Sequence, residues 1–357
     1  YETSGTLTEW REHVSSLCVG NSRLILATST AFASTLLKIT GDENGGVHIV
    51  GASSTGKTTA GTVAGSVFGG ASMKQTWNAT LNGLGATAIT FNDAVMILDE
   101  LSQCEPRAAG ETAYLLSNGV EKGRANRNGS MKARRRWRMM FLSNGEIDLA
   151  QHLRSDGKKV KAGQGVRLLT IPADAGACLG LFEDLHGHPN GAAFADTLKA
   201  NSLKHYGTAG PTFIEKIAGR QNEVAGQITE LRKQFLNKHM PSGAESQVGR
   251  AAARFALIAI AGELATAYGI TGWGRGEATE SAVKCFQDWQ DLRGGIGNHE
   301  ERAFLEQIRE HFERHGESRY AEIQGGKVRD DGRAIHDRAG FRESTGEDET
   351  GTSGAYN

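Results

Sequence analysis

The sequence predicts an α/β protein in which a parallel sheet surrounds a phosphate-binding loop (P-loop) and is flanked by N-terminal and C-terminal helical regions. Three observations lead to this prediction. Short apolar segments alternate with helical patterns, a glycine-rich loop follows the first apolar segment, and a pair of carboxylates follows another. Strands that alternate with helices form a parallel sheet with helices on both faces.

Five short segments are the expected strands of this sheet. They cover residues 47–51, 73–78, 94–98, 138–143 and 166–171. The run AVMIL at 94–98 is apolar throughout, which is typical of a parallel strand buried on both faces. Helices are expected after the glycine-rich loop and over residues 80–90 and 108–118.

Helical patterns also precede and follow the sheet region. Apolar residues recur at helical spacing over residues 6–19 and 21–39, and Asn21 or Ser22 is a suitable cap for the second helix. After residue 180, helices are expected over 192–206, 211–239, 245–268, 277–293 and 299–315. The last sixteen residues, 342–357, are polar and acidic without periodicity and are expected to be a flexible or truncated end.

These patterns divide the chain into four expected regions. They are an N-terminal helical region (1–40), a P-loop ATPase core (41–180), a C-terminal helical region (181–320) and a tail or the start of a truncated small domain (321–357). The sequence begins at Tyr1, without Met, so we expect it to be a piece of a longer protein.

Composition limits the class of protein and its partners. The 357 residues carry a formal net charge of −1, so any attraction to nucleic acid must come from a local basic patch. No apolar run is long enough to span a membrane and no signal pattern is present, which predicts a soluble cytoplasmic protein without a membrane partner. The scattered cysteines are expected to be reduced, buried thiols, namely Cys18, Cys104, Cys178 and Cys285.

The segment GASSTGKTT matches the P-loop pattern GxxxxGK[ST] and lies between an expected strand and an expected helix. Glycine allows the backbone N–H groups to point at phosphates, and the helix that follows adds its positive end. Lys57 supplies a charge to the β- and γ-phosphates of ATP, and the Thr58 hydroxyl is a ligand for Mg²⁺. The expected nucleotide-binding residues are Gly51, Ala52, Ser53, Ser54, Thr55, Gly56, Lys57, Thr58 and Thr59.

Two carboxylates, Asp99 and Glu100, follow the apolar strand at 94–98. A carboxylate at the carboxyl end of a parallel strand faces the ligand crevice. Asp99 is suited to hold Mg²⁺ through water, and Glu100 to polarise the attacking water as general base. A pair of acids that caps a helix is the structural alternative.

Two further residues at strand ends are catalytic candidates. Asn144 follows the strand at 138–143, where an amide can orient the lytic water or touch the γ-phosphate, although SNG is also ordinary turn chemistry. Arg167 opens the next strand and can stabilise transition-state charge at the γ-phosphate of a neighbouring subunit. A surface arginine is the alternative for Arg167.

The motif set resembles a known family. HIVGASSTGKTT, the stretch ending in AVMILDEL, YLLSNGVEKGRANRNG, RRRWRMMFLSNGE and GQGVRLLTIPAD occur in this order, followed by RFALIAIAGELAT and ERAFLEQIREHFERHGESRY. They resemble the uncharacterised P-loop ATPase domain of phage and integrative-element primase–helicase proteins, over about residues 6–342. That domain is similar to the ring-forming AAA+ ATPases, closest to superfamily 3 helicases.

The resemblance implies roles for several residues and a set of partners. Asn144 falls at sensor 1 and Arg167 at the arginine finger, whereas Arg250 and Arg254 are candidates for a lid arginine, with an ordinary helix-surface arginine as the alternative. It also implies a homo-oligomer of hexameric type, single-stranded or forked DNA as substrate, and a primase domain in the same or a neighbouring chain. Family membership does not by itself establish unwinding.

Residues 119–138 form the strongly basic segment of the chain. They contain eight Lys or Arg residues against one acid, Glu121, and NRNG has the Asn–Gly of a tight hairpin turn. In superfamily 3-like rings this position holds a β-hairpin that projects into the channel and would follow a phosphate backbone. The candidate DNA-binding residues are Arg124, Arg127, Lys132 and Arg134. The alternatives are a solvated face, or contact of Arg124 with the nucleotide of a neighbour.

Three functions of different class therefore compete, the last of which is a non-motor assembly module that binds ATP and hydrolyses it slowly. The first is an ATP-hydrolysing ring motor on nucleic acid, a helicase-type ATPase for replication of a phage or mobile element. The second is an AAA+ ATPase that remodels protein or acts as a regulatory switch without unwinding. Protein-remodelling motors place an aromatic residue in a pore loop, for which Trp77 is the candidate, although its surroundings also fit a buried strand end.

Overall fold

The chain folds as two compact units, residues 1–297 and 298–357. The computed structural model describes residues 2–121, 134–156, 165–295, 308–315, 318–324, 327–328, 338–343 and 355–356. The first unit contains the sheet and every candidate catalytic residue.

A five-stranded parallel sheet organises the first unit, in the order β2-β3-β4-β1-β5. Its strands are β1 (Gly45–Val50), β2 (Lys74–Thr76), β3 (Val95–Asp99), β4 (Met140–Gly145) and β5 (Leu168–Pro172). The expected α/β class with a parallel sheet is therefore confirmed. Because the strands are parallel, the loops that follow them lie along one edge of the sheet, with β1 at its centre between β4 and β5.

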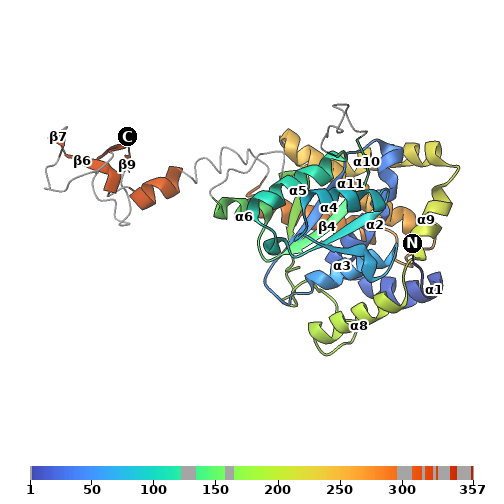
Figure 1. Cartoon of the computed structure of the whole chain (residues 1–357). Helices are drawn as coiled ribbons and strands as arrows, with labels where there is room; N and C mark the ends of the chain where they lie inside the picture. The colour runs from blue at the N-terminus through green and yellow to red at the C-terminus, as the bar shows by residue number, and fades with distance from the viewer. Residues whose placement is uncertain are drawn as a thin grey trace, which may run out of the picture. The chain divides into compact units, whose positions relative to one another are not determined.

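Helices cover both faces of this sheet (Figure 1). The apolar core on one face joins the strands to α2 (Ser22–Thr40), α3 (Lys57–Ser66), α11 (Ser246–Ala267) and α12 (Glu277–Leu292). The core on the other face includes residues of α4 (Leu81–Thr90), α5 (Pro106–Asn118) and α6 (Leu149–Ser155).

Alternation of side chains along each strand decides which core a residue joins. In β3, Val95 and Ile97 belong to the core on the α3 face, whereas Met96 and Leu98 belong to the core on the α4–α5 face. By the same alternation, Asp99 lies on the α3 face, the face where the P-loop continues into a helix.

Two expected helices are irregular or interrupted. Residues 6–19 are not one α-helix, because α1 (Leu7–Trp10) continues as a π-helix (Arg11–Ser15) and a 3-10 helix (Ser16–Cys18). The helix predicted over 211–239 is two, α9 (Ala209–Ile217) and α10 (Gln221–His239). Gly219 lies between them at φ +76°, a left-handed conformation that interrupts the helix. The helix α8 (Gly191–Lys204) agrees with the pattern at 192–206.

The second unit contains a small sheet of its own, in the order β7-β6-β8-β9. Its strands are β6 (Tyr320–Gln324), β7 (Lys327–Val328), β8 (Gly340–Glu343) and β9 (Ala355–Tyr356), and residues 308–315 are helical. β8 pairs with β9, so the described residues at this end belong to the small sheet, which disagrees with the flexible alternative for 342–357 and leaves the truncated end as a prediction.

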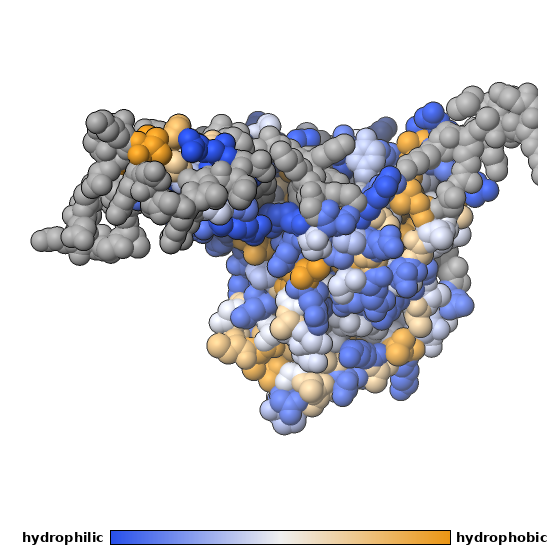
Figure 2. Space-filling model, turned by 60° about the vertical axis from the view of Figure 1, so that its left-hand side comes forward, coloured by the Kyte–Doolittle hydropathy of each residue, from blue (hydrophilic) through white to orange (hydrophobic). Residues whose placement is uncertain are grey.

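The composition led to expectations about apolar segments and about the burial of the cysteines, which can be compared with the structure. Within the described residues, no helix is both long enough and apolar enough to cross a membrane. Figure 2 shows a face of the molecule on which hydrophilic residues predominate and apolar residues occur in scattered patches. Cys18, Cys104 and Cys285 are buried as expected, but Cys178 is exposed. It lies in a turn after β5 with φ +59°, outside both cores.

Candidate functional site

The P-loop joins β1 to α3 in a tight conformation that depends on glycine. Gly56 has φ +95°, and a Cβ at Gly51 would lie 2.8 Å from the Cβ of Ala173. Leu181 N–H donates to the Thr55 carbonyl at 2.9 Å, so the segment after β5 is fastened to the outside of the loop. The loop is thereby held in a fixed shape at the carboxyl edge of the sheet.

Lys57 is a buried lysine at the first position of α3. Its Nζ donates to the carbonyls of Gly51 at 2.7 Å and Ala52 at 2.5 Å. Burial lowers the pKa of Lys57, although the nearby carboxylates of Glu100, Glu146 and Asp99 oppose this shift. The ammonium group therefore points into the P-loop and is hydrogen-bonded to the carbonyl groups at its start.

Asp99 accepts bonds from three elements. Asn144 Nδ2 donates to Asp99 Oδ1 at 2.8 Å, and the Thr58 hydroxyl donates to the same oxygen at 3.4 Å. Lys74, at the start of β2, forms an ion pair with Asp99 Oδ2. We did not predict a role for Lys74 from the sequence, because its proximity depends on the pairing of β2 with β3, which places Thr76 beside Asp99.

Asn144 connects the two carboxylate residues. Its Oδ1 accepts the Glu100 backbone N–H at 3.0 Å while its Nδ2 donates to Asp99. Glu100 itself has φ +55°, an uncommon conformation for a residue with a side chain. Its carboxylate accepts the Ser102 hydroxyl at 2.6 Å and caps the short helix Leu101–Gln103.

These residues fit a nucleotide phosphate group and Mg²⁺. The Thr58 hydroxyl and Asp99 carboxylate supply hard oxygen ligands, and Mg²⁺ takes few protein ligands while it keeps several waters. Thr59 lies in the first turn of α3 and is fully buried, so its side chain is not open to a ligand. The structure therefore brings together Lys57, Thr58, Asp99, Glu100 and Asn144 at one edge of the sheet.

Trp77 is fully buried and donates its Nε1–H to Ser143 Oγ at 2.9 Å. The pore-loop interpretation of Trp77 is therefore wrong, because a pore-loop aromatic must be exposed to its substrate. The alternative interpretation, a buried residue at a strand end, is correct.

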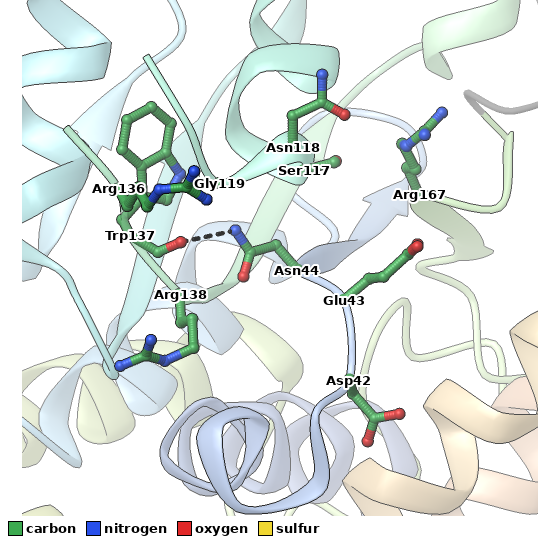
Figure 3. A pocket seen from close by; sticks show the side chains of 10 residues that line it. All are labelled: Asp42, Glu43, Asn44, Ser117, Asn118, Gly119, Arg136, Trp137, Arg138 and Arg167. Carbon is green, nitrogen blue, oxygen red and sulfur yellow. Dashed lines mark hydrogen bonds between the residues drawn. The ribbon is translucent and has the colours of Figure 1, made fainter. Parts of the chain in front are cut away.

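Arg167 lies directly before β5, at the amino ends of the strands, whereas the P-loop lies at their carboxyl ends. It lines a cavity of about 300 Å³ with Asp42, Glu43, Asn118 and others (Figure 3). Its guanidinium lies 5.2 Å from the ring centroid of Tyr114. The structure therefore does not bring Arg167 to the P-loop of its own chain.

Neither candidate lid arginine lies at the P-loop. Arg254 is partly buried and donates to the carbonyls of Asn44 and Val166, at the same edge as Arg167. Burial lowers its pKa to about 10. Its guanidinium pairs with backbone carbonyls beside β1 and β5, so the structure does not bring Arg254 to the P-loop of its own chain. Arg250 is exposed.

The basic segment begins and ends as an antiparallel pair. Val120 bridges to Arg136, Glu121 N–H donates to the Arg135 carbonyl at 2.9 Å, and Trp137 N–H donates to the Gly119 carbonyl at 3.0 Å. Arg134 is exposed beside this pair. The other candidate DNA-binding residues, Arg124, Arg127 and Lys132, lie outside the described residues.

Comparisons with known proteins agree with this description. A family model described as a domain of unknown function, DUF927, matches residues 1–136, which include the P-loop, Asp99 and Glu100. No curated protein matches the chain. A solved structure described as the active helicase Cch of SCCmec type IV is similar, with a TM-score of 0.70 and 18% identity. The similarity covers 96% of this chain and 60% of that one, so the chain spans about three-fifths of that helicase. At this identity the likeness shows the fold alone.

Proposed function

We propose that the chain is an ATP-hydrolysing ring motor that acts on nucleic acid, a helicase-type ATPase for replication of a phage or mobile element. The observation that carries the proposal is the convergence of five side chains, from the ends of two strands and the start of α3, at the carboxyl edge of the sheet. Asn144 and Asp99 lie 2.8 Å apart there, and Thr58 reaches the same carboxylate.

In this proposal the phosphates of ATP bind the backbone N–H groups of the P-loop, and Lys57 exchanges its bonds to Gly51 and Ala52 for the β- and γ-phosphates. Thr58 and Asp99 hold Mg²⁺, which neutralises phosphate charge. Glu100 accepts the proton of the attacking water, after its carboxylate leaves Ser102. Asn144 orients that water beside the carboxylates.

The two edges of the sheet support assembly into a ring. The nucleotide site lies at the carboxyl edge and Arg167 at the amino edge, so head-to-tail stacking of identical chains would bring Arg167 toward a neighbour's nucleotide. Such heterologous contacts close into rings when the rotation per subunit allows it. A hexamer with Arg167 as the arginine finger is the arrangement that we propose.

Nucleic acid is the proposed substrate because the antiparallel base at Val120 and Arg136 carries a densely basic segment. Cationic loops around a central channel would bind a phosphate backbone independently of its sequence. The fold likeness to a helicase supports the same substrate class. Buried Trp77 removes the main support for a motor that acts on polypeptide.

The test is the steady-state ATPase rate measured alone, with single-stranded DNA, and with an unfolded protein as control. We expect DNA to raise the rate and unfolded protein to leave it unchanged. Lys57→Ala protein provides the background in each arm. Stimulation by unfolded protein, without stimulation by DNA, would favour the protein-remodelling alternative.

A further inference from the structure

A buried chain of hydrogen bonds lies directly behind the candidate site. Trp77 Nε1 is 2.9 Å from Ser143 Oγ, Ser143 Oγ is 2.8 Å from His48 Nδ1, and His48 Nε2 is 3.0 Å from the Ile147 carbonyl oxygen. Trp77 and His48 are fully buried and Ser143 is 1% exposed. Polar groups this deeply buried are costly unless each is satisfied.

Only one arrangement of protons gives every donor and acceptor in these hydrogen bonds a partner. The Ile147 carbonyl can only accept, so His48 carries its hydrogen on Nε2 and its Nδ1 is an acceptor. The Trp77 indole can only donate, so Ser143 Oγ accepts from it and donates its own hydrogen to His48 Nδ1. Burial lowers the pKa of His48 to about 4, which keeps the ring neutral, as this arrangement requires.

These hydrogen bonds join the elements that carry the catalytic candidates. His48 lies on β1, two residues before the strand ends at the P-loop, and is paired in register with Ser143 on β4. Trp77 N–H also donates to the Asp99 carbonyl at 3.4 Å. Side chains alternate along β4, so Ser143 points to the α4–α5 face and the next residue, Asn144, to the α3 face.

We infer that Ser143 and His48 are positioning residues, which fix the end of β4 so that Asn144 holds the Asp99–Glu100 pair. This inference rests on the proposed ATPase function. Neither residue need touch nucleotide, because each acts through the backbone of β4 on the Asn144 amide. The role is specific to this end of the strand, since it depends on the bonds to His48 and Trp77.

The opposite end of β4 offers a matched control. Ser34 is also a fully buried serine, and its Oγ accepts the Met140 N–H at 3.3 Å. Ser34→Ala and Ser143→Ala therefore remove the same kind of atom, a buried serine Oγ that is hydrogen-bonded at one end of β4. Ser143 belongs to β4 itself, whereas Ser34 reaches the start of the strand from α2. A general loss of packing or stability would affect turnover in both variants alike.

The experiment compares ATP turnover, ATP affinity and the thermal midpoint of the two variants. We expect Ser143→Ala to lower kcat about fivefold or more, as the loss of one positioning hydrogen bond would, with ATP affinity unchanged within about twofold. Ser34→Ala should leave kcat within about twofold of the parent chain. Trp77→Phe keeps an aromatic ring but removes the Nε1–H donor, and should lower kcat in the same direction.

The outcomes separate this inference from the proposed function. Equal losses of kcat in Ser143→Ala and Ser34→Ala, or a loss confined to ATP affinity, would overturn the positioning role while the ATPase function stands. If Ser143→Ala does not fold, retention of full kcat in Trp77→Phe would overturn it instead. Absence of ATP hydrolysis in the parent chain would overturn both.

Discussion

Burial determines the pKa of His48. Desolvation lowers its pKa from the ordinary 6.5 to about 4, with Lys57 acting in the same direction and Asp148 and Glu100 opposing it. Between these two values the unfolded chain binds a proton that the folded chain excludes. The stabilisation by neutral His48 is therefore complete above pH 6.5 and is lost progressively as the pH falls toward 4.

We predict that the free energy of unfolding falls by about 2 kcal/mol between pH 7 and pH 5 through His48 alone. The check is urea unfolding at both pH values for the parent chain and for His48→Asn. The substituted chain should be less stable at pH 7, yet should lose about 2 kcal/mol less on acidification. Identical pH dependence in the two proteins would show that His48 titrates normally in the fold.

Asn44 is a second single residue on which several segments depend. It is buried, its Nδ2 donates to the carbonyls of Leu116 and Trp137 at 3.2 Å, and its Oδ1 accepts the Met139 N–H at 3.1 Å. One side chain thus ties the end of α5 to the strand that returns from the basic segment.

We predict that Asn44→Ala lowers the free energy of unfolding by about 2–3 kcal/mol, because buried backbone groups lose their partners. Asn118→Ala is the control, since Asn118 lines the same cavity but is exposed (Figure 3), and should change stability by less than about 0.5 kcal/mol. Denaturant unfolding of both variants measures the difference. Equal stability of the two would show that the bonds of Asn44 are replaced by water.

Among the elements, the basic segment has the most direct bearing on function. Its antiparallel base is fixed by the Val120–Arg136 bridge and by Trp137, which is buried and donates Nε1–H to the Leu116 carbonyl at 3.1 Å. The residues between these ends carry the charges that we propose for DNA contact. A paired base next to a run of basic residues suits a segment that binds a polyanion.

Neutralising Arg127 and Lys132 to Gln should weaken binding to single-stranded DNA and make the slope of log affinity against log salt shallower, since fewer counterions are released. ATP hydrolysis without DNA should persist, because the P-loop and carboxylates lie on other segments. Fluorescence titrations at several salt concentrations measure both quantities. Collapse of basal hydrolysis with an unchanged salt slope would instead assign the segment to contacts between subunits.

The strands and most helices of the first unit could be predicted because their signals are local. Buried apolar runs precede the P-loop and begin AVMILDE and RMMFLSN, and each run is followed by polar residues. All three runs are confirmed as strands whose polar ends lie at one edge. The division of 211–239 was missed because a single Gly219 interrupts an otherwise continuous helical pattern.

The contacts that hold the site residues in place could not be predicted, since they depend on the order and register of the strands. Lys74 reaches Asp99 only because β2 pairs with β3, and Trp77 reaches Ser143 from β2 across β3. Arg254 looked like a surface residue on an amphipathic helix, yet its partners are carbonyls more than eighty positions away along the chain. Such pairs leave no spacing signal in one sequence.

At the scale of the whole molecule, the proposed ring requires each subunit to complete its neighbour's site. Arg167 and the P-loop lie at opposite edges of the sheet, so the same chain cannot use both on one nucleotide without a large rearrangement. The cavity at Arg167 also contains Asp42 and Glu43, which gives this edge mixed charge (Figure 3).

We predict that Arg167→Ala and Lys57→Ala are each inactive but recover ATP hydrolysis when mixed. In a mixed ring, some intact P-loops face intact arginines, which stabilise transition-state charge by an effect of about 10³-fold or more. ATPase rate across a series of mixing ratios is the measurement, with mixed assembly verified by differential labelling. No recovery at any ratio would assign Arg167 a structural role, such as its contact with Tyr114.

The central claim is that the carboxyl edge of the sheet binds ATP and hydrolyses it. Parallel measurement of nucleotide binding and turnover in Lys57→Ala and Glu100→Gln tests this claim most directly. Lys57 meets phosphate charge already in the ground state, whereas Glu100 matters only when water attacks. Lys57→Ala should therefore lose ATP binding, and Glu100→Gln should bind ATP as the parent chain does while turnover falls. Normal binding by Lys57→Ala, or full hydrolysis by Glu100→Gln, would contradict the assignment of this edge as the catalytic site.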